Sequence, residues 1–300
     1  MSALPQRPSL IDRAGELRSD SAQIEQLWQR ASIIEVGKGR IRSTQDGPTF
    51  LTAADATGGE RYFLGIDLAT QTPYFAWASG VVDSEVEDYL TLRQLSGSLS
   101  PLHLELSMHA IALSNWHDAH PYCAKCGGPT RIDLAGAARK CDRDESQHHP
   151  RTDPAVIVLI KDRADRILLG HQPVWPDGRF STFAGFLEPG ETFEQCVARE
   201  VFEEAGVRLS EVKYLGSQPW PFPASVMIAF EAVTDAPEET RPDGEEITEV
   251  QWFSRAELKT AAENGSLLLP PTVSVARKMI EGWLGDTSLD REKLAGETWR

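Results

Sequence analysis

The chain of 300 residues is poor in several features, and each shortage argues against a class of protein. Its 30 lysines and arginines are outnumbered by 45 aspartates and glutamates, so a formal net charge of -15 argues against a surface built to hold a long phosphate backbone. The longest apolar run, residues 155–160, has the length of a strand rather than of a membrane span. No positively charged apolar leader occupies the first 20 residues. We therefore expect a cytoplasmic protein without a membrane partner.

Cysteine is also scarce, but three of the four cysteines lie close together in the sequence. Such a cluster in a chain of this length indicates metal binding in a reducing compartment rather than a disulfide framework. The first knuckle is Cys123-x-x-Cys126, whereas the second, Cys141-x-x-Asp144, carries a carboxylate in place of a thiol. The segment either folds without metal and keeps inert thiols, or it holds a structural Zn²⁺, which also accepts carboxylate and imidazole ligands. The candidates for a fourth ligand are Asp144, His148 and His149.

Two regions with different residue patterns precede the part of the chain that holds the candidate catalytic residues. Residues 1–105 contain short apolar stretches separated by Gly, Pro, Asp and Ser, which predicts a small, strand-rich N-terminal domain. Residues 106–151 are predicted to hold a linking helix, which begins near residue 102 and ends near 117, and then a zinc-ribbon-like segment. The three-and-four spacing of a helix with one buried face is seen at Leu104, Met108, Ile111 and Ala112.

Residues 152–285 alternate strand and helix signals, which predicts an α/β domain whose helices cover a mixed sheet. The polar residues 286–300 are predicted to form a loosely held C-terminal tail. Strand patterns occur at residues 155–160, 166–169, 180–184 and 226–233. The predicted ends of helices are the capping boxes Thr192 with Gln195 and Ser254 with Glu257, and the closing residues Gly206 and Gly285.

The chemistry is concentrated in a glycine-containing loop and the helix that follows it. Glu200, Glu203 and Glu204 stand at positions i, i+3 and i+4, so their carboxylates share one helix face. Like charges so placed destabilise a helix unless a cation compensates them, and Mg²⁺ or Mn²⁺ would take these oxygen ligands. A metal held there would lower the pKa of a bound water until it attacks phosphorus. The alternative is a solvated acidic face with Arg199 as a basic neighbour.

The whole segment resembles the signature of the Nudix hydrolase family. That resemblance implies an α/β/α sandwich in which Glu200, Glu203 and Glu204 bind metal. It also implies that the backbone carbonyl of Ala184 joins these ligands and that Arg199 holds the carboxylates in place. The positions that match the signature are Gly185, Glu191, Arg199, Glu200, Val201, Glu203, Glu204, Gly206 and Val207.

A second segment narrows the choice of substrate. Three prolines in five positions stiffen its backbone and hold two aromatic side chains, which suit a flat heterocycle unless they simply fill the core. The string resembles a segment that lines the substrate pocket in the NADH pyrophosphatase branch of the family. Its residues are Gln218, Pro219, Trp220, Pro221, Phe222, Pro223, Ala224 and Ser225.

Three further positions follow from the same resemblance. The branch implies metal binding by Glu246, for which Glu245 and Glu249 are competitors. It implies substrate contacts from Ala276 and from His149, which stands where the branch has a tyrosine.

The resemblance implies a homodimeric enzyme that hydrolyses NAD(H) to nicotinamide mononucleotide and AMP. Glu200, Glu203, Glu204 and Arg199 would carry this catalysis with metal-activated water. Removal of an NAD cap from the 5′ end of RNA would break the same bond, and a broader dinucleotide or ADP-ribose pyrophosphatase is a third alternative. The rival outside the enzymes is an inactive nucleotide-binding regulator, in which we would expect the signature glutamates to be lost; here all are present.

Overall fold

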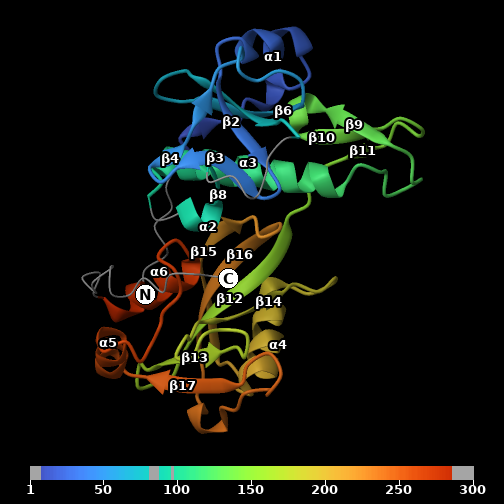
Figure 1. The fold of residues 1–300 in the computed structure, drawn as a ribbon. Coiled ribbons are helices and arrows are strands. Elements are labelled where there is room, and N and C mark those ends of the chain that lie inside the picture. The colour runs from blue at the N-terminus through green and yellow to red at the C-terminus, as the bar shows by residue number, and fades with distance from the viewer. Residues whose placement is uncertain (1–7, 81–87, 96–97, 286–300) are drawn as a thin grey trace. The chain divides into compact units, whose positions relative to one another are not determined.

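The structure, a computed structural model, describes residues 8–80, 88–95 and 98–285 (Figure 1). These residues form two compact units. One comprises the described parts of Arg7–Thr152 with Trp220–Ala224, and the other comprises Asp153–Pro219 with the described part of Ser225–Arg300. The predicted tail, residues 286–300, lies outside the described residues. In the ranges that are described, no helix is both long and apolar enough to cross a membrane.

The first unit is built on an eight-stranded sheet, which confirms the predicted strand-rich character of this region. The sheet order is β1-β6-β7-β2-β3-β4, while β5 pairs with β2 and β8 pairs with β3. The strands are β1 (Ile11–Asp12), β2 (Ser32–Gly37), β3 (Arg40–Thr44), β4 (Gly47–Pro48), β5 (Phe50–Leu51), β6 (Glu60–Asp67), β7 (Pro73–Ala78) and β8 (Tyr89–Thr91). The helical segments are η1 (Gly15–Leu17), α1 (Ser21–Trp28), α2 (Leu92–Leu95) and α3 (Pro101–Ala119).

Helix α3 confirms the helix expected near residues 102–117, but its buried face is wider than predicted. Of the four residues chosen from their spacing, Ile111 is buried, and the other three are only half-buried. The buried positions include Leu106 and Ala110, which pack into the core of the sheet, and Trp116 and His117 near the C-terminal end. The helix is covered on more than one side, so apolar spacing alone does not identify its most buried residues.

The cysteine-containing segment forms a small sheet in the order β11 (Gln147–His148), β10 (Ala138–Cys141) and β9 (Thr130–Asp133), with η2 (Leu134–Gly136) between β9 and β10. His117 of α3 connects this segment to the larger sheet. Its Nε2 donates to the carbonyl of Gly136 at 2.9 Å, its Nδ1 accepts from Arg139 at 2.9 Å, and its ring stacks on Tyr62 of β6 at 4.3 Å between centroids. The zinc-ribbon-like segment is therefore fixed by buried polar contacts as well as by apolar packing.

The second unit contains a six-stranded mixed sheet in the order β15-β16-β12-β13-β17, with β14 paired to β12. Strands β12 and β16 run parallel, and the pairs of β12 with β13 and with β14 are antiparallel. The strands are β12 (Asp153–Lys161), β13 (Ile167–His171), β14 (Phe183–Phe186), β15 (Glu211–Trp220), β16 (Ser225–Val233) and β17 (Glu249–Phe253). The helical segments are α4 (Phe193–Ala205), η3 (Pro237–Glu239), α5 (Arg255–Glu263) and α6 (Val275–Leu284).

Alternate side chains of the central strand β12 face two different cores, as the period of a strand requires. Val156, Val158 and Ile160 pack with residues of α4, whereas Ile157 and Leu159 pack with residues of α5 and α6. The sheet is thus covered by α4 on one face and by α5 and α6 on the other (Figure 1). This confirms the predicted α/β/α sandwich.

Two strands of this sheet differ from the prediction. Strand β14 begins at Phe183 rather than at residue 180, because Ser181 instead forms an isolated bridge with Gly170. Strand β15 was not predicted, and it runs through Pro219 at the edge of the sheet. A proline is tolerated on an edge strand because its missing N–H is not needed by a neighbour.

Candidate active site

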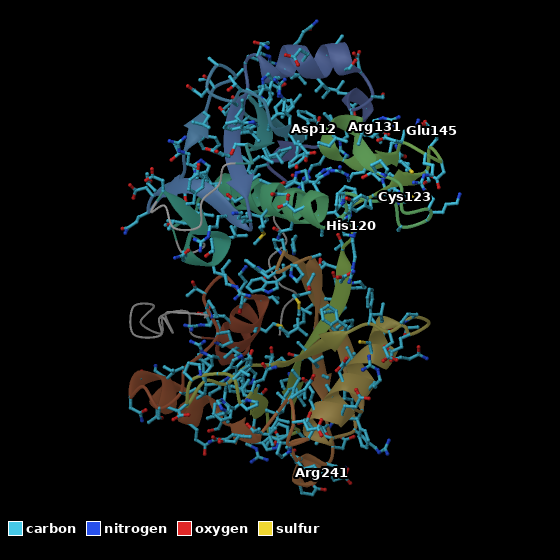
Figure 2. The ribbon with its side chains drawn as sticks, turned by 45° about the vertical axis from the view of Figure 1, so that its right-hand side comes forward. Asp12, His120, Cys123, Arg131, Glu145 and Arg241 are labelled. Carbon is cyan, nitrogen blue, oxygen red and sulfur yellow. The ribbon has the colours of Figure 1, made fainter. Side chains whose placement is uncertain are left out.

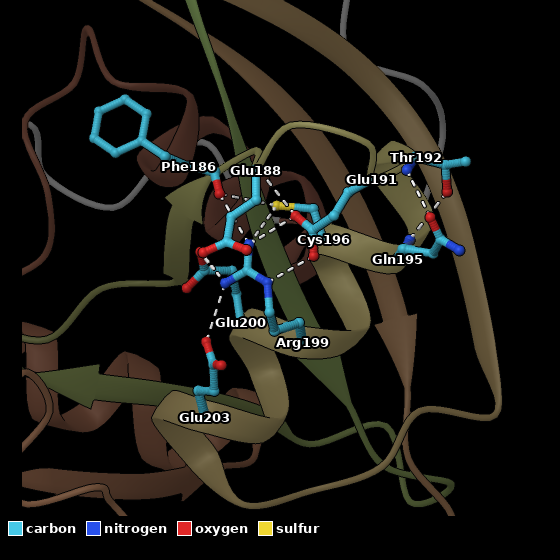
Figure 3. A network of polar contacts seen from close by, with 9 residues as sticks. All are labelled: Phe186, Glu188, Glu191, Thr192, Gln195, Cys196, Arg199, Glu200 and Glu203. Atoms are coloured by element: carbon cyan, nitrogen blue, oxygen red, sulfur yellow. Dashed lines mark hydrogen bonds and ion pairs between the residues drawn. The ribbon is translucent and has the colours of Figure 1, made fainter.

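A short loop joins β14 to α4, and local signals fix where the helix begins and ends (Figure 3). Thr192 is the N-cap: its side chain accepts from the backbone N–H of Gln195 at 3.2 Å, and the Gln195 side chain accepts from the N–H of Thr192 at 2.8 Å. Gly206 ends the helix in the left-handed conformation at φ 73°. These caps confirm the predicted ends and set which residues of α4 face the loop.

Arg199 joins the loop to three acidic side chains (Figure 3). Its Nε and one terminal nitrogen donate to both carboxylate oxygens of Glu191, at 2.7 and 2.8 Å. The other terminal nitrogen donates to Glu200 at 2.8 Å and to Glu203 at 3.0 Å. The guanidinium lowers the pKa of Glu191 to about 2, and these carboxylates raise the pKa of Arg199. Arg199 therefore holds three carboxylates through direct hydrogen bonds, and its role in catalysis stays a prediction.

Glu191 was not among the predicted site residues, although it is part of the signature. Its part in the site is visible only in three dimensions, where both of its carboxylate oxygens accept from Arg199. The carbonyl of Phe186 also accepts from Arg199, at 3.0 Å. Glu191 lies eight residues before Arg199 and outside the helix, so helix geometry does not bring the two side chains together. Their pairing depends on how the loop folds back over α4.

Glu204 and Glu200 lie at the point where α4 faces β14. The side chain of Glu204 is buried, and one of its carboxylate oxygens accepts from the backbone N–H of Ala184 at 3.3 Å. Burial, followed by the charge of Glu200, raises the pKa of Glu204 to about 8. Burial also raises the pKa of Glu200. A divalent cation would relieve both effects, because it replaces the lost hydration and neutralises the neighbouring charge.

Glu246 is exposed and lies on the loop before β17. Its charge raises the pKa of both Glu200 and Glu204, so its carboxylate lies within electrostatic reach of α4. Glu203 is more than half exposed and is held toward Arg199. The glutamates therefore share one region of the domain. Within the described residues, however, their carboxylate oxygens are not grouped as closely as the possible ligand atoms of the cysteine cluster.

The family profile of the NUDIX domain matches residues 151–271, which include this loop, α4 and Glu246. An NAD-capped RNA hydrolase NudC of Mycobacterium bovis is 38% identical over 290 residues, covering 91% of this chain and 92% of the relative. The chain belongs to the Nudix hydrolase family. An NAD-capped RNA hydrolase NudC of Stutzerimonas stutzeri is 39% identical and covers 75% of this chain and 74% of the relative. The mitochondrial NAD(P)H pyrophosphatase NUDT13 of Mus musculus is 37% identical and covers 74% of this chain and 68% of the relative.

These comparisons confirm the family and the NADH pyrophosphatase-like branch inferred from the sequence. Membership identifies the chain as a hydrolase and implies use of a divalent metal. The carboxylate oxygens of the Nudix helix fit that requirement, since hard divalent cations prefer oxygen ligands.

The side chain of Gln218, predicted to contact substrate, is buried in the Nudix domain and fully engaged with protein. Its Nε2 donates to the carbonyl of Val273 at 2.8 Å, and its Oε1 accepts from the N–H of Val275 at 2.7 Å. Gln218 therefore ties strand β15 to the first turn of α6, next to Ala276, which is also buried. Ser225 is buried at the start of β16, in register with Asp153 of β12.

Of the remaining predicted substrate residues, Pro219 belongs to the same unit as Gln218, whereas residues 220–224 and His149 belong to the first unit. The rings of Trp220 and Phe222 meet edge to face at 5.0 Å between centroids, and the guanidinium of Arg93 lies 4.6 Å from the centroid of Phe222. His149 is exposed just after β11.

The side chains of the cysteine cluster lie close enough together that they could hold a metal ion (Figure 2 labels Cys123). One possible ligand atom each from Cys123, Cys126, Cys141 and Asp144 lies within 4.8 Å of all the others. Backbone N–H groups of Lys125 and Arg143 point at the sulfurs of Cys123 and Cys141, each at 3.3 Å, which stabilises thiolates. His148 Nε2 lies 3.2 Å from the sulfur of Cys123, so a second candidate for the fourth ligand is adjacent to the cluster.

Proposed function

We propose that this Nudix hydrolase cleaves the pyrophosphate bond of NAD(H) to give NMN(H) and AMP. The observation that carries the proposal is the pairing of buried Glu204 with the amide of Ala184 on the helix face that also presents Glu200 and Glu203. The names of the relatives, an NAD-capped RNA hydrolase and an NAD(P)H pyrophosphatase, support the choice of substrate. In the reaction, water adds to one phosphorus, and the bridging oxygen leaves with the other phosphate.

The proposed metal ligands are the carboxylates of Glu200, Glu203, Glu204 and Glu246 and the carbonyl of Ala184. Bound there, Mg²⁺ or Mn²⁺ would polarise the phosphate oxygens and make the attacking water more acidic. Arg199 positions the carboxylates through its bonds to Glu200 and Glu203. Either Glu203 or Glu204 would take the proton of the attacking water.

For substrate binding we propose the segment from Gln218 to Ser225, with Ala276 and His149. Gln218 is assigned here to shaping the site, because both of its polar atoms already bond to residues 273 and 275. The aromatic faces of Trp220 and Phe222 are the groups in this segment that suit a nicotinamide or adenine ring. We further propose that the protein is a homodimer, which sedimentation analysis would test. We also propose that it is cytoplasmic.

A second candidate function, removal of an NAD cap from the 5′ end of RNA, is favoured by the names of two of the relatives. The same pyrophosphate bond would be broken. The net charge of -15 does not favour contacts along an extended RNA chain, although it leaves recognition of the terminus open.

One assay distinguishes these functions. The purified chain is incubated with NADH, NAD, ADP-ribose or NAD-capped RNA under Mg²⁺ or Mn²⁺, and the release of AMP or of the uncapped RNA is followed. A higher rate with NADH than with the other substrates supports the first proposal. Glu204→Gln is the matched variant, because it keeps an acceptor for the Ala184 amide but removes the charge. Near-normal turnover by this variant would sink the mechanism.

We also propose that Cys123, Cys126, Cys141 and Asp144 hold one structural Zn²⁺. Three thiolates and one carboxylate make an acceptable tetrahedral ligand set for zinc. The close grouping of the four side chains and the N–H groups aimed at two of the sulfurs support this assignment.

A further inference from the structure

Asp243 controls the shape of the loop that carries Glu246. One carboxylate oxygen of Asp243 accepts from the backbone N–H of Glu245 at 2.8 Å and from that of Ile247 at 2.9 Å. The loop closes further through the N–H of Gly244, which donates to the carbonyl of Ile247 at 3.0 Å. Glu246 lies between the two residues whose N–H groups Asp243 binds. Its direction is therefore set by a turn closed by three hydrogen bonds.

Both ends of this loop are attached to the Nudix helix or its core. Upstream, the N–H of Arg241 donates to the carbonyl of Ala205 at the C-terminal end of α4, at 3.0 Å (Figure 2 labels Arg241). Downstream, Ile247 is buried in the same apolar cluster as Val197 and Val201 of α4. Because both ends of the loop are held against α4, the conformation of the loop determines where Glu246 lies relative to the helix.

We propose that Asp243 is a positioning residue of the metal site, which acts by hydrogen-bonding the backbone on both sides of Glu246. This inference rests on the proposed function in one respect, the assignment of Glu246 as a metal ligand. Asp243 touches neither substrate nor metal in this account. Its role in the turn depends on the acceptor oxygen, while its charge acts separately on Glu204.

The two substitutions Asp243→Asn and Asp243→Ala separate these contributions. Asparagine retains an oxygen that accepts both N–H groups, whereas alanine leaves both without their partner. Mn²⁺ affinity, measured on the full chain by electron paramagnetic resonance, is expected to fall about tenfold or more in D243A, the usual effect of losing a residue that orients a ligand. In D243N it is expected to stay within about threefold of wild type, since an exposed charge contributes little.

A third variant tests the turn without altering any charge. Gly244 has φ +84°, and a Cβ added there would meet no atom within 4 Å, so Gly244→Ala strains the backbone without a clash. We expect it to weaken Mn²⁺ binding in the same direction as D243A. Thermal unfolding of each variant checks that the domain is folded, and G244A keeps the inference testable if D243A does not fold.

The inference is overturned if D243N loses as much Mn²⁺ affinity as D243A, because the charge would then be the active property. It is also overturned if folded D243A and G244A both bind Mn²⁺ as the wild type does. Glu246→Gln and Glu204→Gln, measured alongside, identify the source of a failure. If these two lose Mn²⁺ affinity and NADH turnover while the Asp243 variants do not, the proposed function stands and only the role of Asp243 is wrong.

Discussion

The carboxylate of Glu200 occupies the space that a side chain at Gly185 would fill. A Cβ built on Gly185 would lie 1.9 Å from Cδ of Glu200 and 2.1 Å from each of its carboxylate oxygens. Gly185 is not among the residues of positive φ, so the requirement for glycine here is one of space and not of backbone conformation. The missing side chain lets a carboxylate of α4 lie directly against the backbone of β14.

Gly185→Ala should therefore disable the site while leaving the fold intact. The alanine methyl group would force Glu200 away from β14 and from its bond to Arg199. A displacement of about 1 Å in a catalytic group costs on the order of 100-fold in rate, so we expect a loss of this size in kcat/KM for NADH. Gly15→Ala is the matched control, because a Cβ there meets nothing within 4 Å. Wild-type turnover by a folded G185A protein would contradict this account.

Arg199→Lys tests whether the geometry of the guanidinium matters beyond its charge. Lysine cannot donate to both oxygens of Glu191 while also reaching Glu200 and Glu203, as Arg199 does. We expect Mn²⁺ affinity or turnover to fall about 10- to 100-fold, as is typical when an orienting partner of metal ligands is lost. Isothermal titration with Mn²⁺ and steady-state kinetics on the same preparation measure the two effects. Equal performance of the lysine variant would mean that a point charge is sufficient.

The parts of the site that local sequence determines were predictable. The capping box at Thr192 and the closing Gly206 depend on residues within a few positions of one another, and both are confirmed. The contacts between Gly185 and Glu200 and between Glu191 and Arg199 depend on β14 lying beside α4. Periodicity and spacing do not reveal that β14 lies beside α4. The family signature therefore marked these positions without showing why these residues are needed there.

Two features of the fold were less predictable, each for a physical cause. Strand β15 lies at the edge of the sheet and half of its residues are exposed, so it lacks the apolar run that marked β12 and β16. The buried face of α3 includes the polar His117, whose burial depends on Arg139 and Gly136 from a different part of the sequence. Patterns of apolar residues cannot reveal a buried polar residue whose partners are distant in the chain.

Gln218→Leu should weaken the link between β15 and α6. Leucine fills a similar volume but leaves the carbonyl of Val273 and the N–H of Val275 without the bonds they make to Gln218. A buried group left without a partner, as the N–H of Val275 would be, costs about 1–3 kcal/mol, so we expect a lower unfolding temperature together with a raised KM for NADH. Faster hydrogen exchange at the Val275 amide would report the loss of the contact directly. An unchanged KM in a folded variant would argue against a role of this link in substrate binding.

The proposed zinc site predicts opposite effects from two substitutions at Asp144. Asp144→Ala removes a ligand and should lower zinc affinity, while Asp144→Cys completes a set of four thiolates and should raise it. Zinc released to a chromogenic chelator under increasing denaturant measures both. His148→Ala is the discriminating variant, because His148 Nε2 lies 3.2 Å from the sulfur of Cys123. Zinc loss in H148A with retention in D144A would assign the fourth position to the imidazole.

His117 predicts a specific loss of stability in acid. Burial, as the largest cause, lowers the pKa of His117 from 6.5 to about 4, and its bonds to Gly136 and Arg139 fit the neutral ring. The unfolded chain therefore binds this proton at a higher pH than the folded chain does. The stabilisation is present in full above about pH 6.5 and is lost as the pH falls toward 4. With about 1.4 kcal/mol for each pKa unit, the loss is about 3 kcal/mol.

His117→Gln isolates this effect from other groups that titrate in the same range. Glutamine can donate to Gly136 and accept from Arg139, but it has no proton to gain between pH 4 and pH 6.5. We expect the variant to be less stable than wild type at pH 7.5, because the stack on Tyr62 is lost, yet to lose less stability on acidification. Thermal unfolding midpoints across this pH range compare the two proteins. If the two plots of unfolding midpoint against pH ran parallel, His117 would not be a source of the acid sensitivity. Only a group that titrates differently in the folded and unfolded states changes the slope of such a plot.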